Sequence, residues 1–256
     1  PSVPHAAVFD TAFHHTLPSY AYLYGLPYEY YEKKGVRRYG FHGSSHSYVA
    51  LRAAQYLQQR VNELEIISCH LGNGASLCAV DHGRSVDTSM GFTPGEGLIM
   101  GTRCGDLDPG AIAYLQREAG LDGVQIEELL NKRSGLLGLS GISSDMREIE
   151  NAVAEGNKRA KYAFDVFCYR IKKYIGAYTA AMGGLDAVVF TGGIGENSVM
   201  VRKEVCKNME YLGIELNNQL NESKPVGEVL LSKSTGKVKV LRIPTNEELV
   251  IALDTE

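Results

Sequence analysis

The stretch His70-Leu71-Gly72-Asn73-Gly74-Ala75-Ser76 lies between two short apolar runs, residues 65–69 and 77–80. Two apolar runs of strand length joined by a turn rich in glycine and asparagine predict a β-hairpin. Because glycine has no side chain, the backbone N–H groups of this turn stay uncovered, and such a turn can surround an anionic oxygen. The stretch is therefore either an ordinary hairpin turn or a phosphate-binding loop, and the local pattern alone leaves both interpretations open.

The rest of the chain predicts an α/β protein around this hairpin. Residues 185–190 form a continuous apolar run, which is typical of a strand buried on both faces of a sheet. A glycine-rich loop at 191–198 and a helix to about residue 211 follow it, in the order typical of nucleotide-binding proteins. Further strands are expected at 6–9, 84–89 and 238–243, with a surface hairpin at 227–236. Helices are expected at 44–60 (with Ser44 or Ser45 as the N-cap), 110–119, 125–131, 143–156 and 157–182.

Composition limits the classes of partner. The chain has 256 residues, is 44% hydrophobic and 22% charged, and carries a net charge of −4. An acidic balance without a basic tract argues against a nucleic-acid partner, and no apolar run reaches the roughly 18 residues of a membrane helix. The five cysteines include no CxxC pair and are expected to be free thiols in a reducing, cytoplasmic compartment. A disulfide between Cys69 and Cys78 is the less favoured alternative.

Three polar side chains occupy positions that suit an anion or a metal ion. Asp10 follows the apolar run 6–9, where a catalytic or metal-binding acid and a helix N-cap are both common. His42 directly precedes a predicted helix, whose N-terminus attracts anions. Arg103 lies in a glycine-flanked segment, and its planar guanidinium suits a phosphoryl group. An ion pair with Asp106 or Asp108 is the alternative for Arg103.

The histidines His42 and His46 are four residues apart, as in the HExxH zinc motif. The glutamate of that motif is absent, however, and Gly43 puts His42 before the helix rather than on it. A zinc hydrolase is therefore disfavoured.

Six motifs, taken together and in order, resemble those of the acetate kinases, and the resemblance extends over essentially the whole chain. Propionate kinases share nearly all of these motifs, and butyrate kinases share the architecture more loosely. The motifs are Val8-Phe9-Asp10-Thr11-Ala12-Phe13-His14, Gly40-Phe41-His42-Gly43-Ser44-Ser45-His46, His70-Leu71-Gly72-Asn73-Gly74-Ala75-Ser76, Gly101-Thr102-Arg103-Cys104-Gly105-Asp106-Leu107-Asp108-Pro109, Thr191-Gly192-Gly193-Ile194-Gly195-Glu196-Asn197 and Pro244-Thr245-Asn246-Glu247-Glu248.

This resemblance implies an actin-like, sugar-kinase-type (ribonuclease H-like) α/β fold, with a mixed sheet, flanking helices and two lobes around the active site. It implies a phosphotransferase with a carboxyl group as acceptor. The reaction is reversible phosphoryl transfer between ATP and acetate, which gives ADP and acetyl phosphate and depends on Mg²⁺ (or Mn²⁺).

The resemblance also implies that an N-terminal lobe is missing, because members of this family begin with residues that have no counterpart here. We expect residues 1–12 to be the last strand of that lobe and a linker. Residues 13–245 are the expected C-terminal nucleotide-binding and dimerisation lobe, and residues 246–256 the start of the helix that returns to the N-terminal lobe. The chain alone is therefore expected to be inactive.

Roles for individual residues follow from the same resemblance. Asp10 is similar to the essential acid of the cleft, and Glu247 to the Mg²⁺ ligand. His42 and Arg103 are similar to the pair that stabilises the transferring phosphoryl group, and both are expected to supply positive charge. Acetate is already ionised at neutral pH and needs no general base, so we expect Asp10 to orient Arg103 or a metal-bound water. The implied ATP-binding residues are His70, Leu71, Gly72, Asn73, Gly74, Asp145, Met146, Arg147, Gly193, Ile194, Gly195, Glu196 and Asn197.

Two alternatives to acetate kinase stay open within this architecture. A propionate kinase differs by one methylene of substrate, which is worth only about 1–3 kcal/mol in an apolar pocket. The second alternative is a catalytically incomplete module that binds ATP and dimerises. Acetate, acetyl phosphate and ATP or ADP are the expected small-molecule partners, and a homodimer through the helix at 157–182 is expected, without nucleic acid or membrane.

Overall fold

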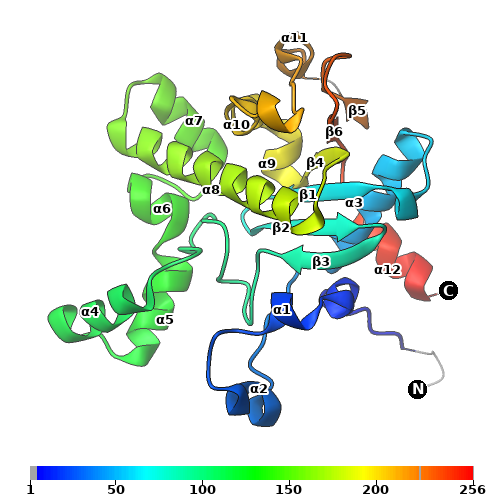
Figure 1. Cartoon of the computed structure of the whole chain (residues 1–256). Helices are drawn as coiled ribbons and strands as arrows, with labels where there is room; N and C mark the ends of the chain where they lie inside the picture. Colours follow the sequence, from blue (N-terminus) through cyan, green and yellow to red (C-terminus); the bar gives the residue numbers. More distant parts are fainter. Residues whose placement is uncertain (1–4, 225, 256) are drawn as a thin grey trace.

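The computed structural model describes residues 5–224 and 226–255, and a mixed sheet lies at its centre (Figure 1). Its strands are β1 (Glu65–Leu71), β2 (Ala75–Asp81), β3 (Arg84–Thr88), β4 (Ala187–Thr191), β5 (Val229–Leu230) and β6 (Lys239–Arg242). The strand order is β3-β2-β1-β4-β6-β5. The pairs β1–β4 and β4–β6 are parallel, whereas β1–β2, β2–β3 and β5–β6 are antiparallel.

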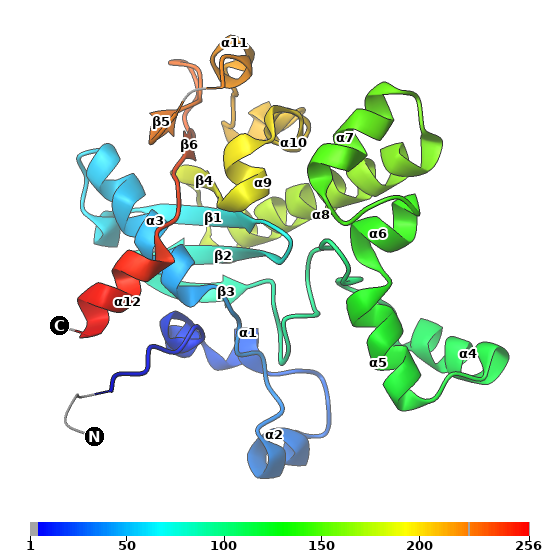
Figure 2. The same ribbon diagram turned by 180° about the vertical axis from the view of Figure 1, so that it is seen from behind.

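Helices cover both faces of the sheet. The long helix α8 (Lys158–Met182) crosses one face, and α3 (Gly43–Tyr56) packs on the other, as the two opposite views show (Figures 1 and 2). The side chains of β1 alternate accordingly, because Ile67 belongs to the core under α8 and Ile66 to the core under α3. The other helices are η1 (Ala12–Thr16), α1 (Ser19–Tyr22), α2 (Tyr28–Lys34), η2 (Val61–Glu63), α4 (Pro109–Ala119), α5 (Gly123–Lys132), α6 (Gly135–Ser140), α7 (Met146–Ala154), α9 (Gly192–Asn197), α10 (Val199–Cys206), η3 (Glu210–Leu212), α11 (Asn218–Glu222) and α12 (Glu247–Thr255).

The fold class predicted from the sequence, a mixed α/β sheet with flanking helices, is confirmed. The hairpin around residues 70–76 is β1 and β2, and the polar excursion at 227–236 contains β5 and its turn into β6. Residues 6–9 pair with no strand among the described residues, and the expectation that residues 1–12 are the last strand of an N-terminal lobe and a linker stays a prediction. The segment 192–197, expected as a loop, is the short helix α9, and the next helix ends at Cys206 rather than near residue 211.

The cysteines are free, as expected. Cys69 on β1 pairs in register with Leu77, so Cys78 is one residue further along β2 and points to the opposite face of the sheet. The two thiols belong to the two different cores, which excludes the disulfide between them. In the described ranges, no helix combines the length and apolar character needed to cross a membrane.

Candidate active site

The turn between β1 and β2 lies where two nitrogen donors from distant segments meet. Gly72 N–H donates a hydrogen bond of 2.9 Å to the carbonyl oxygen of Gly74, which closes the turn. A Cβ atom built on Gly74 would lie 3.4 Å from Nε2 of His42 and 3.6 Å from Nη1 of Arg103. The missing side chain of Gly74 thus leaves room for a ligand atom beside both nitrogens.

His42 is placed at the start of α3 by contacts with Asp10. The backbone N–H of His42 donates to the Asp10 carboxylate at 2.7 Å, and Gly43 N–H donates to the Asp10 carbonyl at 2.8 Å. Helix α3 therefore begins at Gly43 with His42 as N-cap, and the expected N-cap at Ser44 or Ser45 is wrong. The physical reason is that Asp10 satisfies the first N–H groups from outside the helix.

Burial makes His42 neutral. The loss of solvation, together with the positive charge of Arg103, lowers the pKa of His42 to about 4. His70 stacks on His42 with 4.1 Å between ring centroids, and burial lowers the pKa of His70 to about 3. The expectation that His42 supplies positive charge is therefore wrong at neutral pH. His42 offers a hydrogen bond, and Arg103 carries the charge.

The histidines do not form a zinc site. Nδ1 and Nε2 of His46 lie within hydrogen-bond distance of Ser68 Oγ (2.6 Å) and Ser76 Oγ (2.8 Å). Nδ1 of His42 lies 2.8 Å from the same Ser76 Oγ. In the part of the chain that the structure describes, no three His, Cys, Asp or Glu residues are grouped to hold a metal ion.

Arg103 is held by neutral acceptors. Its Nη1 donates to the carbonyl oxygen of Pro94 at 3.2 Å. The segment that carries it is tied to the β1–β2 turn, because Gly101 N–H donates to the carbonyl oxygen of Asn73 at 2.9 Å. These contacts leave the guanidinium without a carboxylate partner among the described residues, so its charge is available to an anion.

The proposed ion pair of Arg103 with Asp106 or Asp108 is wrong. Asp106 accepts hydrogen bonds from the Tyr174 hydroxyl (2.8 Å) and from Gly97 N–H (2.9 Å). The Asp108 carboxylate caps α4 instead. Both acids thus stabilise the backbone around Arg103, because local backbone donors and α8 compete successfully for them.

Asp10 and Glu247 are the carboxylates that suit a divalent cation. Glu247 is the first residue of α12, a helix that packs against α3. Burial raises the pKa of Glu247, and the negative charge of Asp10 raises it further. Two carboxylates that repel each other offer oxygen ligands to a cation that would relieve the repulsion. Mg²⁺ commonly binds through one or two carboxylates together with phosphates, so this donor set fits it.

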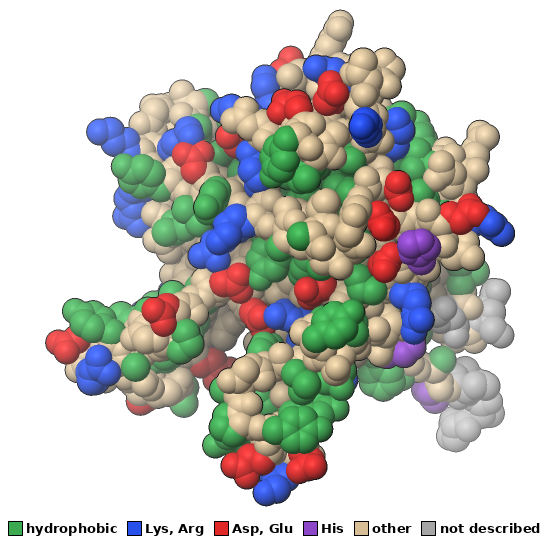
Figure 3. Space-filling view, in the orientation of Figure 1, with side chains coloured by type: hydrophobic (Ala, Val, Ile, Leu, Met, Phe, Trp, Pro, Cys, Tyr) green, Lys and Arg blue, Asp and Glu red, His purple; other side chains and the backbone are tan. Residues whose placement is uncertain are grey.

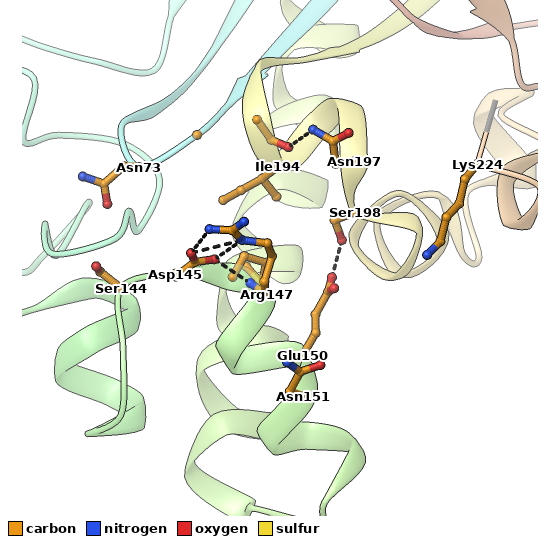
Figure 4. Close-up of a pocket in the computed structure, with 13 residues that line it drawn as sticks. Asn73, Ser144, Asp145, Arg147, Glu150, Asn151, Ile194, Asn197, Ser198 and Lys224 are labelled. Carbon is orange, nitrogen blue, oxygen red and sulfur yellow. Dashed lines mark hydrogen bonds and ion pairs between the residues drawn. The ribbon is translucent and has the colours of Figure 1, made fainter. Parts of the chain in front are cut away.

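A cavity of about 770 Å³ opens beside the β1–β2 turn, between α7 and α9 (Figure 4). Eight of the residues expected to bind ATP line it: Gly72, Asn73, Asp145, Met146, Arg147, Gly193, Ile194 and Asn197. Five others lie outside its lining: His70, Leu71, Gly74, Gly195 and Glu196. Five lining residues were not expected: Ser144, Glu150, Asn151, Ser198 and Lys224.

Ion pairs and hydrogen bonds fix the cavity wall (Figure 4). The Asp145 carboxylate accepts from Arg147 N–H at 2.8 Å, which caps α7, and pairs with the Arg147 guanidinium at 2.5 Å. This hydrogen bonding lowers the pKa of Asp145. Across the cavity, the Ser198 hydroxyl donates to Glu150. Glu150 lies three residues after Arg147 on the same helix face, so the helical spacing in the sequence could have predicted Glu150 as a lining residue. No sequence pattern points to Lys224 as a lining residue.

Glu196, expected to bind ATP, lies outside the cavity lining and connects the segments that follow β4 and β6. Its Oε1 accepts from Gly192 N–H at 3.1 Å, at the start of α9. The same oxygen accepts from Thr245 N–H at 3.3 Å, shortly before α12. Glu196 therefore connects the segment that leads to Glu247 with the helix that borders the cavity.

The comparisons with known proteins agree with this architecture. The sheet, its flanking helices and its solved neighbours define an actin-like α/β fold. The chain matches the Acetokinase family over residues 1–253. The chain belongs to this family.

Named relatives are similar to the chain over all of its length. It is 56% identical over 257 residues to "Acetate kinase" of Caldicellulosiruptor saccharolyticus and 58% identical over 256 residues to "Acetate kinase" of Alkaliphilus metalliredigens. In both comparisons all of this chain is covered, and it spans 64% of the relative's length.

Solved structures show the same similarity. The crystal structure of Porphyromonas gingivalis acetate kinase is 52% identical, with a TM-score of 0.95, covering 97% of this chain and 62% of that one. A propionate kinase from Francisella tularensis is 44% identical, with a TM-score of 0.90, covering 96% and 62%.

Proposed function

We propose that the chain is the nucleotide-binding lobe of an acetate kinase, which transfers a phosphoryl group between ATP and acetate. The observation that carries the proposal is the convergence of His42 Nε2 and Arg103 Nη1 over Gly74. This point is next to the cavity, because Gly72 and Asn73 of the same turn line the cavity. A nucleotide in the cavity would extend its phosphates along the turn toward the two nitrogens.

The reaction needs alignment and charge stabilisation more than covalent chemistry. A carboxylate oxygen of acetate attacks the γ-phosphorus, the bond from that phosphorus to the bridging oxygen breaks, and the bonding electrons leave with ADP. Arg103 stabilises the negative oxygens of the transferring group by charge, and His42 by an N–H hydrogen bond. A Mg²⁺ ion held by Glu247 and Asp10 with the phosphates would neutralise charge on the nucleotide.

The role proposed for Asp10 follows from its contact. Its carboxylate binds the backbone N–H of His42 at 2.7 Å, so it orients the residue that carries the imidazole. Acetate has a pKa far below neutrality and needs no base. This contact supports an orienting role toward His42, beside the expected orientation of Arg103 or a metal-bound water.

Product analysis tests the function. The protein in its full natural length is incubated with ATP, Mg²⁺ and either acetate or propionate, and acyl phosphate is trapped as the hydroxamate. Faster turnover with acetate supports acetate kinase, and faster turnover with propionate supports propionate kinase, as the Francisella neighbour suggests. ADP binding by calorimetry with no hydroxamate from either acid would favour the non-catalytic ATP-binding module.

We further propose a cytoplasmic homodimer. The five free cysteines suit a reducing compartment. On α8, the side chains of Tyr162 and Tyr169 are 61% and 60% exposed. Large exposed aromatic side chains on one helix suit a partner surface. Light scattering at micromolar concentration tests this, and a mass of one chain would contradict it.

A further inference from the structure

Two serines and two histidines form a buried chain of hydrogen bonds that ends at His42. Ser68 Oγ lies 2.6 Å from His46 Nδ1, and His46 Nε2 lies 2.8 Å from Ser76 Oγ. Ser76 Oγ in turn lies 2.8 Å from His42 Nδ1. Ser68, His46 and Ser76 are fully buried. The serines are on β1 and β2, so this series of hydrogen bonds, here called the relay, connects the sheet to the start of α3.

The buried hydroxyl of Ser68 determines which group donates and which accepts in each hydrogen bond of the relay. Within the described residues, His46 Nδ1 is the hydrogen-bond partner of Ser68 Oγ. If His46 donated from Nδ1, the Ser68 hydroxyl hydrogen would have no acceptor, which is unfavourable in a buried site. Ser68 is therefore the donor, and the proton of the neutral His46 ring is on Nε2.

The remaining steps follow because each group has a limited number of hydrogens. His46 Nε2–H donates to Ser76 Oγ, and the single hydroxyl hydrogen of Ser76 is then free to donate to His42 Nδ1. His42 Nδ1 is an acceptor, so its proton is on Nε2. That nitrogen faces the space over Gly74 beside Arg103.

We propose that Ser68, His46 and Ser76 are positioning residues that hold His42 as the neutral tautomer with its proton on Nε2. In this tautomer His42 gives its N–H to an anion over Gly74, whereas the other tautomer would present a lone pair to it. The low pKa values of His42 and His46, both caused mainly by burial, agree with neutral rings. The catalytic meaning of the relay rests on the proposed function, but the tautomer itself does not.

Nitrogen NMR measures the tautomer directly. Long-range ¹H–¹⁵N spectra are recorded at pH 7 on the chain labelled at histidine, with the His42 signals assigned through His42→Gln. We expect a protonated Nε2 and a bare Nδ1 on His42. A His42 proton on Nδ1 in the unmodified chain would overturn the proposal.

The variant Ser76→Ala tests the relay, and Ser85→Ala is its matched control. Ser85 is also buried and its Oγ lies 2.8 Å from a histidine nitrogen, His14 Nδ1, but it is outside the relay. Ser76→Ala should populate the second His42 tautomer, whereas Ser85→Ala should leave the His42 signals unchanged. An unchanged tautomer ratio in Ser76→Ala would contradict the proposal.

Kinetics of the protein in its full natural length separate this inference from the proposed function. Ser76→Ala should lower kcat about tenfold or more, because a preorganised donor is lost, while KM for ATP changes less than about twofold. Ser85→Ala should keep kcat. Full kcat in Ser76→Ala would overturn the positioning role. Absence of phosphoryl transfer in the unmodified protein would instead refute the proposed function, and the NMR result would still decide the tautomer.

Discussion

The hydroxyl of Tyr174 donates a hydrogen bond of 2.8 Å to Asp106, and this contact joins the long helix α8 to the segment that carries Arg103. The same carboxylate accepts from Gly97 N–H, and Asp106 N–H donates back to the Gly97 carbonyl. Burial and the Asp106 charge raise the pKa of Tyr174, so the phenol stays protonated and remains a donor.

The variant Tyr174→Phe should loosen the Arg103 segment. We expect a loss of about 1.5–3 kcal/mol in the free energy of unfolding, from one hydrogen bond to a charged group. We also expect phosphoryl transfer to slow about threefold to tenfold, since small displacements of an aligned group are costly. Denaturant unfolding and the hydroxamate assay measure both. Tyr211→Phe removes an exposed hydroxyl away from α8 and should change neither quantity.

The variant Gly74→Ala should block the anion site without unfolding the chain. Its Cβ would lie 3.4 Å from His42 Nε2 and 3.6 Å from Arg103 Nη1, in the space that a transferring phosphoryl group needs. The backbone of Gly74 is not left-handed, so alanine is compatible with it. We expect kcat to fall about 100-fold, with ADP affinity kept within about threefold. Gly123→Ala, where an added Cβ has nothing within 4 Å, is the control and should behave as the unmodified protein. Normal turnover in Gly74→Ala would contradict the placement of the reaction over this turn.

The variant Arg147→Ala should weaken nucleotide binding. Arg147 lines the cavity and its guanidinium is oriented by the ion pair with Asp145. We expect the Kd for ADP, measured by calorimetry, to rise about tenfold, equivalent to about 1.4 kcal/mol. Arg117→Ala, on α4 and outside the cavity lining, should leave the Kd unchanged. Equal Kd values for the two variants would exclude this cavity as the nucleotide site.

Stability should fall on acidification from pH 6.5 toward pH 4. The pKa of His42 is lowered to about 4, and burial also lowers the pKa values of His14 and His46. Between the lowered pKa and the ordinary value near 6.5, the unfolded chain binds more protons than the folded chain, so the free energy of unfolding rises with pH. Above pH 6.5 this contribution is fully present.

Urea unfolding at several pH values measures this dependence. Each buried histidine contributes at most about 1.4 kcal/mol per pH unit to the slope. His42→Gln removes one such group and should reduce the slope of the unfolding free energy against pH. The range from about pH 4.5 to 6 is suitable, because it lies between the lowered pKa of His42 and the ordinary value. A slope in His42→Gln identical to that of the unmodified protein would contradict a buried, neutral His42.

Much of the fold was predictable because it depends on local pattern. The apolar runs at 65–69 and 77–80 and the glycine turn between them predicted the hairpin, and the helical spacing of residues 157–182 predicted α8. The segment at 6–9 is unpaired among the described residues, because a strand depends on a partner, which local pattern does not contain. The start of α3 was misplaced for a similar reason, since its first N–H groups are satisfied by Asp10, far away in sequence.

The candidate site was only partly predictable. Glycine turns and a glycine-flanked arginine are local signals, and the structure brings Gly74, His42 and Arg103 together. The charge state of His42 was wrongly predicted, because burial of a ring depends on tertiary packing. Lys224 and the pair Glu150–Ser198 were missed, since the cavity that unites them forms only when α7, α9 and the segment after α11 come together.

The left-handed backbone of His42, with φ of 57°, has a consequence for how this position evolves. A side chain in that conformation costs about 1–2 kcal/mol relative to glycine, so a glycine here would relax the chain. The imidazole, however, is the part that reaches Gly74. The ring also stacks on His70 and lies 2.8 Å from the Ser76 hydroxyl. These buried contacts offset the strain, so the side chain that the site needs is also the one that stabilises a backbone conformation otherwise suited to glycine.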